Sequence, residues 1–247
     1  VRSGTTWTQQ AKLLASDAAA SDEFGFKVKI HGDYAIVGSY RNDDAGNDSG
    51  SAYIFVRSGT TWTQQAKLLA SDASSTDKLG HAVAINGDDA IVGAYATGAS
   101  YEGAAYIFVR SGTTWTQQAK LLASDAAAAD YFGNSVGISS NTAVVGAYYS
   151  DDGATNSGSA YIFTRTGTSW TQQAKLLASD AAESDYFGEQ LAISGKHIIV
   201  GVWQNDDGGS SSGSAYIFSG SYGTSIGTQE VEKWDSNINL DVSGNIY

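Results

Sequence analysis

Residues 1–18 read VRSGTTWTQQAKLLASDA, and residues 56–73 and 109–126 repeat this phrase without change. A fourth copy, residues 164–181, differs at three positions. The tryptophans of the four copies are spaced by 55, 53 and 55 residues. A fixed period of this length indicates a repeat architecture. A residue that recurs in every repeat is therefore first a structural residue, and function is sought where equivalent positions line up or where one repeat departs.

The composition excludes several classes of function. The chain has 247 residues, of which 42% are hydrophobic, so it can bury a real core. It has no cysteine, which leaves neither a disulfide framework nor a thiolate metal site. The net charge of −12 argues against nucleic acid or an anionic membrane surface as a partner and suits cations or cationic partners. No apolar run is long enough to span a membrane. Because the chain opens inside the repeated phrase, we expect a segment excised from a longer protein.

Each repeat divides into four segments that are typical of short β-strands. In the first repeat, residues 24–30 alternate apolar and polar side chains, and residues 34–38 are nearly all apolar. Residues 52–56 are rich in β-formers, whereas residues 62–69 are the most polar and are expected at the outer edge. Tight turns join the first strand to the second and the third to the fourth. A polar loop, residues 41–50, joins the second to the third.

Four antiparallel strands per repeat of this length are the signature of a β-propeller blade. We therefore predict an all-β fold, a β-propeller of four-stranded antiparallel blades with four complete blades and a partial fifth. The alternative is a stacked β-solenoid, whose repeats are shorter and whose strands are parallel. Within a single propeller domain or propeller fragment, the predicted blades are about residues 24–70, 79–123, 132–178 and 187–234.

The two ends of the chain predict how the ring ends. Residues 7–14 read as an outer strand without a blade of its own, and residues 227–234 as a degenerate outer strand for the fourth blade. Residues 237–247 read as a hairpin that is cut off. We predict that residues 1–15 and 237–247 form a defective fifth blade in an open or poorly closed ring. The alternative is an arc cut from a larger propeller.

Two short motifs recur in every repeat, fourteen residues apart. They are Phe24-Gly25 with Gly38, Leu79-Gly80 with Gly93, Phe132-Gly133 with Gly146, and Phe187-Gly188 with Gly201. This pattern resembles the FG-GAP repeat family, whose best-known members are the propellers of integrin α subunits. The resemblance covers about residues 7–219 and implies a propeller on an extracellular or cell-surface protein. It implies little about activity, because propellers host many functions.

The chain departs from the family pattern in two respects. The proline of the GAP element is replaced by an aromatic residue in every repeat, at Tyr40, Tyr95, Tyr148 and Trp203. Calcium-binding members carry an Asp-x-Asp-x-Asp-Gly loop between the two elements, where this chain has a short turn such as residues 31–33. A turn this short has too few carboxylates to surround Ca²⁺ with six to eight oxygens. The family's metal site is therefore not carried over.

The direction of the strands places most acids on one face. Because antiparallel strands reverse at each connection, the polar loops and the links between repeats emerge on the same face, here called the loop face. Eight acids lie in the loops and ten in the links, eighteen of the chain's 26, against Arg41 and Lys78 as bases. The tight turns on the opposite face carry Arg57, Arg110 and Arg165. We therefore predict a strongly negative loop face.

A recurring pair of aspartates in the loops is the candidate metal site. The pairs are Asp43 and Asp44, Asp151 and Asp152, and Asp206 and Asp207. Carboxylates are the hard oxygen ligands that Ca²⁺ takes, so these loops are candidates for weak calcium binding. The alternative is that aspartates populate loops because they form turns and keep the surface soluble. The second repeat has residues 96–102 in this place, without a pair, and should not bind the metal.

The sequence offers little for catalysis. The histidines His31, His81 and His197 occupy non-equivalent positions, so we expect turn or surface histidines that do not converge on a ligand. Paired carboxylates could support glycoside hydrolysis, but aspartates in solvated loops lack the apolar pocket that raises the pKa of one of them. Aromatic residues within the strands, such as Tyr53 and Trp62, are expected to pack between blades.

These observations favour a non-catalytic binding or adhesion module, extracellular or at the cell surface, rather than an enzyme. We expect a protein or glycan ligand on the acidic loop face, no nucleic acid, no membrane insertion, and no cofactor apart from the candidate Ca²⁺. One alternative is a structural spacer within a larger surface protein. The other is a propeller glycosidase or lyase, which the solvated aspartate pairs disfavour.

Overall fold

The structure is a computed structural model that describes residues 2–3 and 5–220, and the described residues form strands, turns and loops without a helix. Three antiparallel sheets have four strands each. The first contains β3 (Val28–His31), β4 (Tyr34–Ser39), β5 (Ser51–Ser58) and β6 (Thr61–Leu68). The second contains β7 (Ala82–Asn86), β8 (Asp89–Ala94), β9 (Ala104–Ser111) and β10 (Thr114–Leu121). The third contains β11 (Ser135–Ser139), β12 (Thr142–Ala147), β13 (Ser159–Thr166) and β14 (Ser169–Leu176).

A fourth sheet has three described strands, and a short hairpin precedes the first sheet. The fourth sheet contains β15 (Gln190–Ser194), β16 (His197–Val202) and β17 (Ser214–Ser219). The hairpin pairs β1 (Arg2–Ser3) with β2 (Thr6–Trp7). The all-β prediction and the strand order within each repeat are confirmed. The described part of the chain has no helix with the length and apolar character that a bilayer crossing needs.

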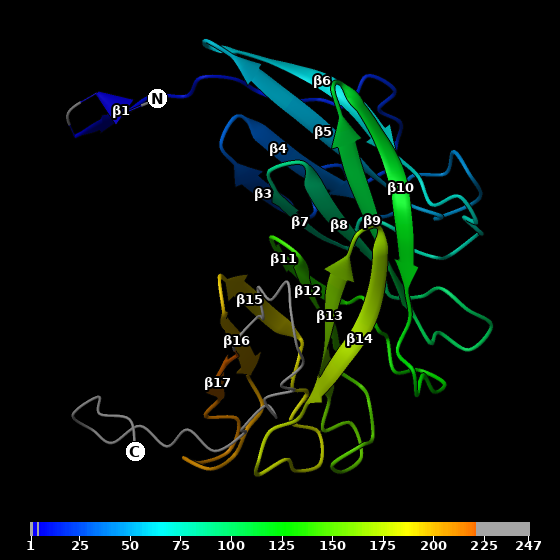
Figure 1. Ribbon diagram of the computed structural model, residues 1–247, viewed down its shortest axis with the longest axis vertical. Helices are drawn as coiled ribbons and strands as arrows, with labels where there is room; N and C mark the ends of the chain where they lie inside the picture. The colour runs from blue at the N-terminus through cyan, green and yellow to red at the C-terminus, as the bar shows by residue number, and fades with distance from the viewer. Residues whose placement is uncertain (1, 4, 221–247) are drawn as a thin grey trace.

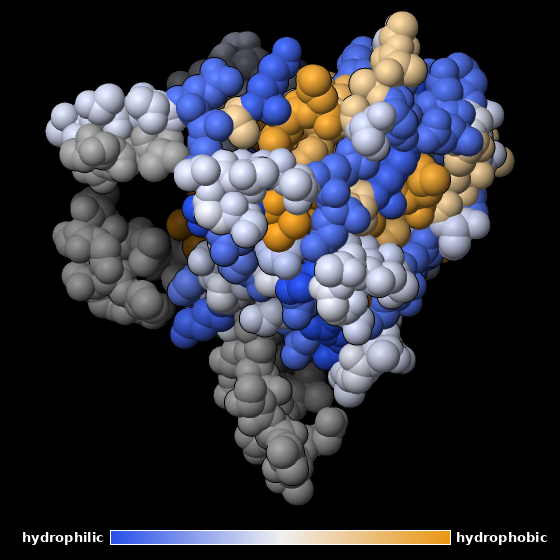
Figure 2. All heavy atoms as spheres, turned by 90° about the horizontal axis from the view of Figure 1, so that it is seen from above, coloured by the Kyte–Doolittle hydropathy of each residue, from blue (hydrophilic) through white to orange (hydrophobic). Residues whose placement is uncertain are grey.

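The sheets follow one another around an arc that stays open. The inner strands β3, β7, β11 and β15 lie on its concave side, and β6, β10 and β14 lie on its outside (Figure 1). The first and fourth sheets are the two ends of the arc. Seen from the first-sheet end, hydrophobic residues are visible among hydrophilic ones (Figure 2). The ring is therefore open over the described residues, in agreement with the open or poorly closed ring predicted from the two ends of the chain.

The paired glycine motifs have a physical explanation in the stacking of sheets. Within the second sheet, the Gly80 N–H donates to the Gly93 carbonyl at 3.0 Å. A Cβ on Gly93 would overlap the carbonyl oxygen of Gly133 in the next sheet. The same backbone contact joins Gly38 to Gly80. Only glycine permits this approach, so the motif fixes the distance between neighbouring blades.

Each pair of neighbouring sheets encloses an apolar core. Ile54, Ile107 and Ile162, at one position of the third strands, are fully buried. Tyr106 and Tyr161, aromatic residues within β9 and β13, are also fully buried, in the core between the first and second sheets and in the core between the second and third, and Trp115 and Trp170 pack against these two cores. The expectation that strand aromatics pack between blades is confirmed. Fully burying one such side chain contributes about 1.5–3 kcal/mol.

The identical phrase is explained by polar contacts between each outer strand and the copy of the phrase one repeat earlier. The Trp62 indole N–H donates to Gln10 Oε1 at 2.9 Å, Gln64 Oε1 accepts the Ser16 N–H at 2.9 Å, and Lys67 pairs with Asp17 at 2.7 Å. The same three contacts recur 53 to 55 residues later, as Trp115–Gln65, Gln117–Ser71 and Lys120–Asp72, and again as Trp170–Gln118, Gln172–Ser124 and Lys175–Asp125. Each inner copy of the phrase thus supplies residues that contact the copy before it and residues that contact the copy after it. A change in the phrase would disturb both contacts, which accounts for its repetition.

Two predicted strands differ from those observed. The strand predicted at residues 24–30 begins only at Val28, because Gly25 has a φ of +99° and turns the chain. Of the outer strand predicted at residues 7–14, only Trp7 lies in a strand, β2, since no sheet edge lies beside the remainder. The predicted strands at residues 227–234 and 237–247 lie outside the described residues.

Candidate functional site

The polar loops lie against the links between blades. Backbone N–H groups of Thr76, Lys78 and Leu79 donate to the carbonyls of Asn47, Asp48 and Ser49, at 2.8, 3.2 and 3.0 Å. The equivalent loops of the next two repeats make the same kind of contact. Loops and links therefore form one continuous surface, the loop face, as the strand directions predict.

The aspartate pairs have partners within the protein. The first aspartate caps its own loop: Asp43 Oδ1 accepts the Asp48 N–H at 2.7 Å, and Asp151 Oδ1 accepts the Asn156 N–H at 2.8 Å. Asp206 does the same with the Ser211 N–H at 2.5 Å.

The second aspartate faces a lysine in two of the three loops. Asp44 pairs with Lys67 and Asp152 with Lys175, both from outer strands. Over the described residues, no three side chains of the His, Cys, Asp and Glu types gather to hold a metal ion. Calcium binding at these loops therefore stays a prediction, tested by a calcium-dependent rise in melting temperature.

The loop face is less negative than the sequence predicts, and this prediction needs correction. Seven of its eighteen acids form ion pairs: Asp17, Glu23, Asp44, Asp48, Asp72, Asp125 and Asp152. The sequence argument counted Arg41 and Lys78 but missed the lysines of the outer strands, which reach the loop face from the ends of β6, β10 and β14. Although burial alone would lower the pKa of Lys67, the carboxylates of Asp17 and Asp44 raise it. Lys67 therefore stays charged.

Four further acids are buried in the links and fold them. The carboxylates of Asp22, Asp77, Asp130 and Asp185 each accept the backbone N–H three residues earlier, at 2.8–3.0 Å. Burial raises the pKa of Asp77 and of Asp130. These acids are structural, so most of the acidity of the loop face serves the fold rather than a ligand.

An unbroken series of aromatic rings crosses all four blades on this face. We call it the aromatic rim; it consists of Phe26, Tyr40, His81, Tyr95, Tyr131, Tyr148, Tyr186 and Trp203. Consecutive ring centroids are 4.4 to 6.3 Å apart. Four of these residues occupy the position after the second strand of each repeat, where the family pattern has proline. Spacings of this size are those of attractive ring pairs, worth about 0.5–1.5 kcal/mol each.

His81 lies inside the rim, which corrects the expectation of a turn or surface histidine. Its ring is 5.0 Å from Phe26, 5.6 Å from Tyr40 and 4.4 Å from Tyr95. Burial, followed by the positive charge of Lys27, lowers the pKa of His81 to about 4. The imidazole is therefore neutral at physiological pH.

The tyrosines of the rim also stay protonated. Burial raises the pKa of Tyr95 and of Tyr148 above the ordinary value of 10.0. Trp203, at the fourth-sheet end of the rim, keeps 55% of its surface exposed. The rim thus offers neutral rings with hydroxyl donors, and an accessible indole at one end.

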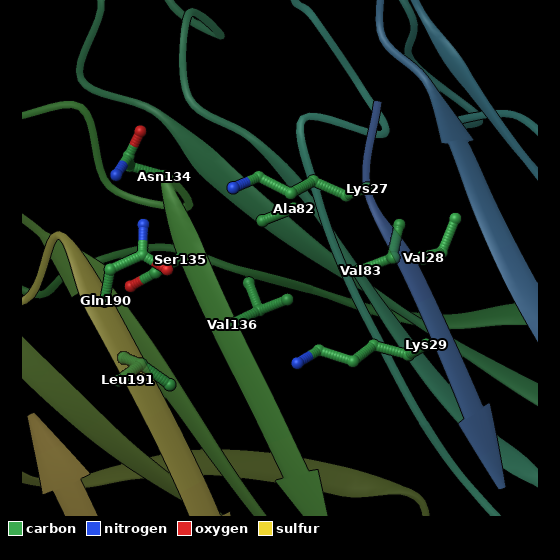
Figure 3. Close-up of a pocket in the computed structure, with 10 residues that line it drawn as sticks. All are labelled: Lys27, Val28, Lys29, Ala82, Val83, Asn134, Ser135, Val136, Gln190 and Leu191. Atoms are coloured by element: carbon green, nitrogen blue, oxygen red, sulfur yellow. The ribbon is translucent and has the colours of Figure 1, made fainter. Parts of the chain in front are cut away.

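The rim borders a cavity of about 140 Å³ on the axis of the arc. Its walls come from the inner strands: Lys27, Val28 and Lys29 at β3, Ala82 and Val83 from β7, Asn134, Ser135 and Val136 at β11, and Gln190 and Leu191 from β15. The amines of Lys27 and Lys29 point from β3 toward the opposite wall (Figure 3). Neither lysine forms an ion pair with any residue that the structure describes.

The cavity and the rim are joined through the sequence. Phe26 of the rim immediately precedes Lys27 of the cavity wall, and His81 of the rim immediately precedes Ala82 of the wall. Residues of the rim and residues of the cavity wall are therefore neighbours in the chain. The cavity is smaller than the roughly 300–1,000 Å³ of a pocket that encloses a drug-sized ligand. It can admit one group of a ligand, with the remainder lying across the rim.

A sequence profile described as the FG-GAP repeat matches residues 7–55, 62–108, 115–163 and 170–218. The chain belongs to the FG-GAP repeat family. The second, third and fourth matches each begin at the outer strand of one sheet and end at the third strand of the next, and the first match runs from Trp7 of β2 to Phe55 of β5. No curated protein matches the chain.

Sequence reasoning missed the aromatic rim as a site. The signal was present, because Tyr40, Tyr95, Tyr148 and Trp203 were recognised as departures from the FG-GAP pattern. A second signal is that the four repeats share their outer strands but differ at residues 23, 78, 131 and 186, which are Glu, Lys, Tyr and Tyr. Positions that vary among the repeats are free of the interface that keeps the outer strands alike.

Proposed function

We propose that this FG-GAP chain is a non-catalytic binding module. Its ligand, a carbohydrate or a segment of a partner protein, lies across the aromatic rim and inserts one group into the axial cavity. The observation that carries the proposal is the unbroken rim, which spans four blades around a hollow lined by Lys27 and Lys29, two lysines without an ion pair among the described residues. The location that we propose, extracellular or at the cell surface, is supported by the resemblance to integrin α subunits.

The chemistry of the rim favours a ligand with apolar faces and polar edges. Flat rings stack on such faces, and the hydroxyls of Tyr95 and Tyr148 can donate to ligand oxygens. Lys27 and Lys29 would attract a carboxylate at the bottom of the cavity despite the net negative charge of the chain. Sugars and aromatic or acidic peptide side chains fit this description, whereas a polycation does not.

The catalytic alternative has little support from the geometry. The adjacent aspartates of the loops contact lysines or backbone N–H groups. They therefore lack the apolar surroundings that would keep one of the two carboxyl groups protonated. His81 contacts aromatic rings and its titration lies near pH 4, which suits packing better than general base catalysis at neutral pH. We therefore infer binding without turnover.

A glycan array and a peptide array probed with the whole chain would test the proposal. For any ligand found, we expect Trp203→Ala and Lys29→Ala each to weaken binding about tenfold or more, as for residues at the centre of an interface. Arg57→Ala, on the opposite face, is the matched control and should change nothing. Binding that is insensitive to the rim variants would contradict the proposed site. Binding to neither array would favour a structural spacer, and turnover of a polysaccharide would contradict the non-catalytic assignment.

A further inference from the structure

The aromatic rim has two halves that differ in whether cations lie beside the rings. In the half that the first two repeats form, the protein itself supplies these cations. The Arg41 guanidinium and the Lys78 amine are each 5.5 Å from the centroid of the Tyr40 ring. The Lys27 amine is 5.6 Å from the centroid of the Phe26 ring. These contacts are attractive because the face of an aromatic ring carries partial negative charge.

An acid accompanies each of the two cations at Tyr40. Arg41 Nε lies 3.3 Å from Glu23 Oε1, and Lys78 Nζ lies 2.6 Å from Asp48 Oδ2. Each cation therefore has both a ring and a carboxylate as partners. The first half of the rim thus builds a unit of ring, cation and carboxylate twice from its own residues.

The half of the rim that the third and fourth repeats form has rings without such a cation. Three of its tyrosines and the neighbouring Tyr149 form what we call the tyrosine cluster: Tyr131, Tyr148, Tyr149 and Tyr186. Between centroids, the Tyr149 ring lies 5.3 Å from Tyr131, 4.4 Å from Tyr148 and 5.1 Å from Tyr186. Within the ranges that the structure describes, no lysine or arginine lies over these four rings. Tyr149 takes the position that Arg41 holds in its repeat, and Tyr131 takes that of Lys78.

The carboxylate of this half belongs to Glu189. In its repeat, Glu189 takes the position that the rim residues Phe26 and His81 hold in the first two repeats. Its Oε2 atom is buried and has no hydrogen-bond partner among the described residues, and none of their ion pairs includes Glu189. A buried carboxylate oxygen without a partner is costly, so a cation bound beside Glu189 would stabilise it.

The charge of Glu189 acts on the tyrosine cluster. Burial, followed by the neighbouring tyrosines and the Glu189 carboxylate, raises the pKa of Tyr148 above its ordinary value of 10.0. Burial and neighbouring tyrosines also raise the pKa of Tyr149, and the Glu189 carboxylate adds to this rise. Glu189 is therefore close enough to both rings to act on the same ligand. All four tyrosines are half-buried, so part of each side chain remains accessible.

We infer that the tyrosine cluster and Glu189 bind one alkylammonium group, which supplies the cation that this half of the rim lacks. Alkyl groups on the nitrogen can cover the ring faces while the charge lies beside the carboxylate. A calcium ion fits less well, because it takes six to eight oxygen ligands and Glu189 offers one carboxylate. The net charge of −12 attracts cations to the chain. This cation is distinct from the group that Lys27 and Lys29 would attract into the axial cavity.

Choline is the probe, because it carries one quaternary ammonium group. Its neutral analogue dimethylbutanol has carbon in place of the nitrogen, and therefore the same shape without the charge. Titration of the whole chain, followed by saturation-transfer NMR of the ligand methyl groups, should show saturable binding of choline. The neutral analogue should bind several-fold more weakly. Choline that binds no better than the analogue, or that does not bind, would overturn the inference.

Two pairs of variants test the carboxylate and the rings. Glu189→Gln should weaken choline binding several-fold, whereas Glu183→Gln, which removes the same charge from an exposed position of the preceding link, should leave it unchanged. Equal weakening by both would reduce the effect to the net charge of the chain and contradict the site. Tyr149→Leu should weaken binding several-fold, and Tyr149→Phe, which keeps the ring, should not. Equal affinities of these two variants would also contradict the site. Circular dichroism shows whether Tyr149→Leu is folded, and the glutamate pair decides if it is not.

A competition experiment distinguishes the two sources of the alkylammonium group, a lipid headgroup and a free molecule. Displacement of choline by phosphatidylcholine vesicles would support a headgroup as the ligand of this site. Choline that stays bound in the presence of the vesicles would support a small molecule in solution.

Discussion

The interior interfaces and the open face of the fourth sheet are made of equivalent residues with different surroundings. Ile54, Ile107 and Ile162 are fully buried, whereas Ile217 at the same position is 59% exposed. The sequence of each repeat therefore specifies a face, and the neighbouring repeat decides whether the face is buried. In a repeat protein the stability lies largely in these nearest-neighbour interfaces.

The glycines of the repeated motif also differ between the interior interfaces and the open face of the fourth sheet. Gly38, Gly93 and Gly146 press against the carbonyl of the glycine in the following sheet. The nearest described atom that a Cβ on Gly201 would meet is 3.7 Å away. A residue that looks invariant within the chain is thus constrained at three positions and unconstrained at the fourth.

Substituting these glycines should have the largest effect. Gly93→Ala places a methyl group against the carbonyl of Gly133, and because backbone cannot move aside cheaply, we expect a loss of about 4 kcal/mol or more in the free energy of unfolding. Gly201→Ala is the matched control and should cost less than about 1 kcal/mol. Urea unfolding followed by circular dichroism measures both. Equal losses would show that a neighbour covers the fourth sheet in solution.

Core truncation gives a smaller version of the same test. Ile107→Ala should lower the free energy of unfolding by about 3 kcal/mol, since it removes buried methylenes and leaves a cavity. Ile217→Ala should cost less than about 1 kcal/mol at protein concentrations at which the chain is a monomer, because the side chain is half in water. If the cost of Ile217→Ala rises with protein concentration, the open face is buried by association.

The fold could be predicted from the sequence because its determinants recur. The phrase at residues 1–18 occurs four times, once with three substitutions, and the period alone places every blade. The strand bounds were harder to predict, since the left-handed conformation at Gly25 delays the start of the strand predicted at residues 24–30 to Val28. Residues 7–14 failed as a strand for a different reason: an outer strand needs a sheet edge beside it, and the sequence does not say which edge is within reach.

The candidate site was predicted less well, because it depends on partners that are distant in the sequence. Asp44 and Asp152, which the sequence offers as candidate metal ligands, form ion pairs with Lys67 and Lys175 that the sequence does not indicate. The aromatic rim brings together rings from four repeats at intervals of 53 to 55 residues. No local pattern predicts that His81 will be enclosed by Phe26, Tyr40 and Tyr95. Only the stacking of the first two sheets does that.

His81 provides a pH test of an interior interface. Its pKa is about 4 in the folded chain against an ordinary 6.5. Between these values the unfolded chain binds more protons, so stability should fall as the pH drops from about 6.5 to about 4. His81→Asn, the residue present at the same position of the third repeat, should remove about 2 kcal/mol of this fall, a figure reduced for partial exposure. His197→Asn, at an exposed position of the fourth sheet, is the control. Unchanged pH dependence in His81→Asn would show that the ring is solvated.

The smallest effect is expected from the polar contacts of the outer strands. Gln65→Met removes the acceptor of the Trp115 indole N–H, which lies at 2.8 Å, and leaves that N–H without its partner in a half-buried position. A lost neutral hydrogen bond of this kind costs about 1 kcal/mol. The matched change Gln173→Met, beside the open edge of the fourth sheet, should cost almost nothing in a monomer, because its described contact is with Thr171 of its own strand. Thermal unfolding at low and high protein concentration measures the pair. A cost for Gln173→Met that appears only at high concentration would mean that a donor of a second molecule binds this amide.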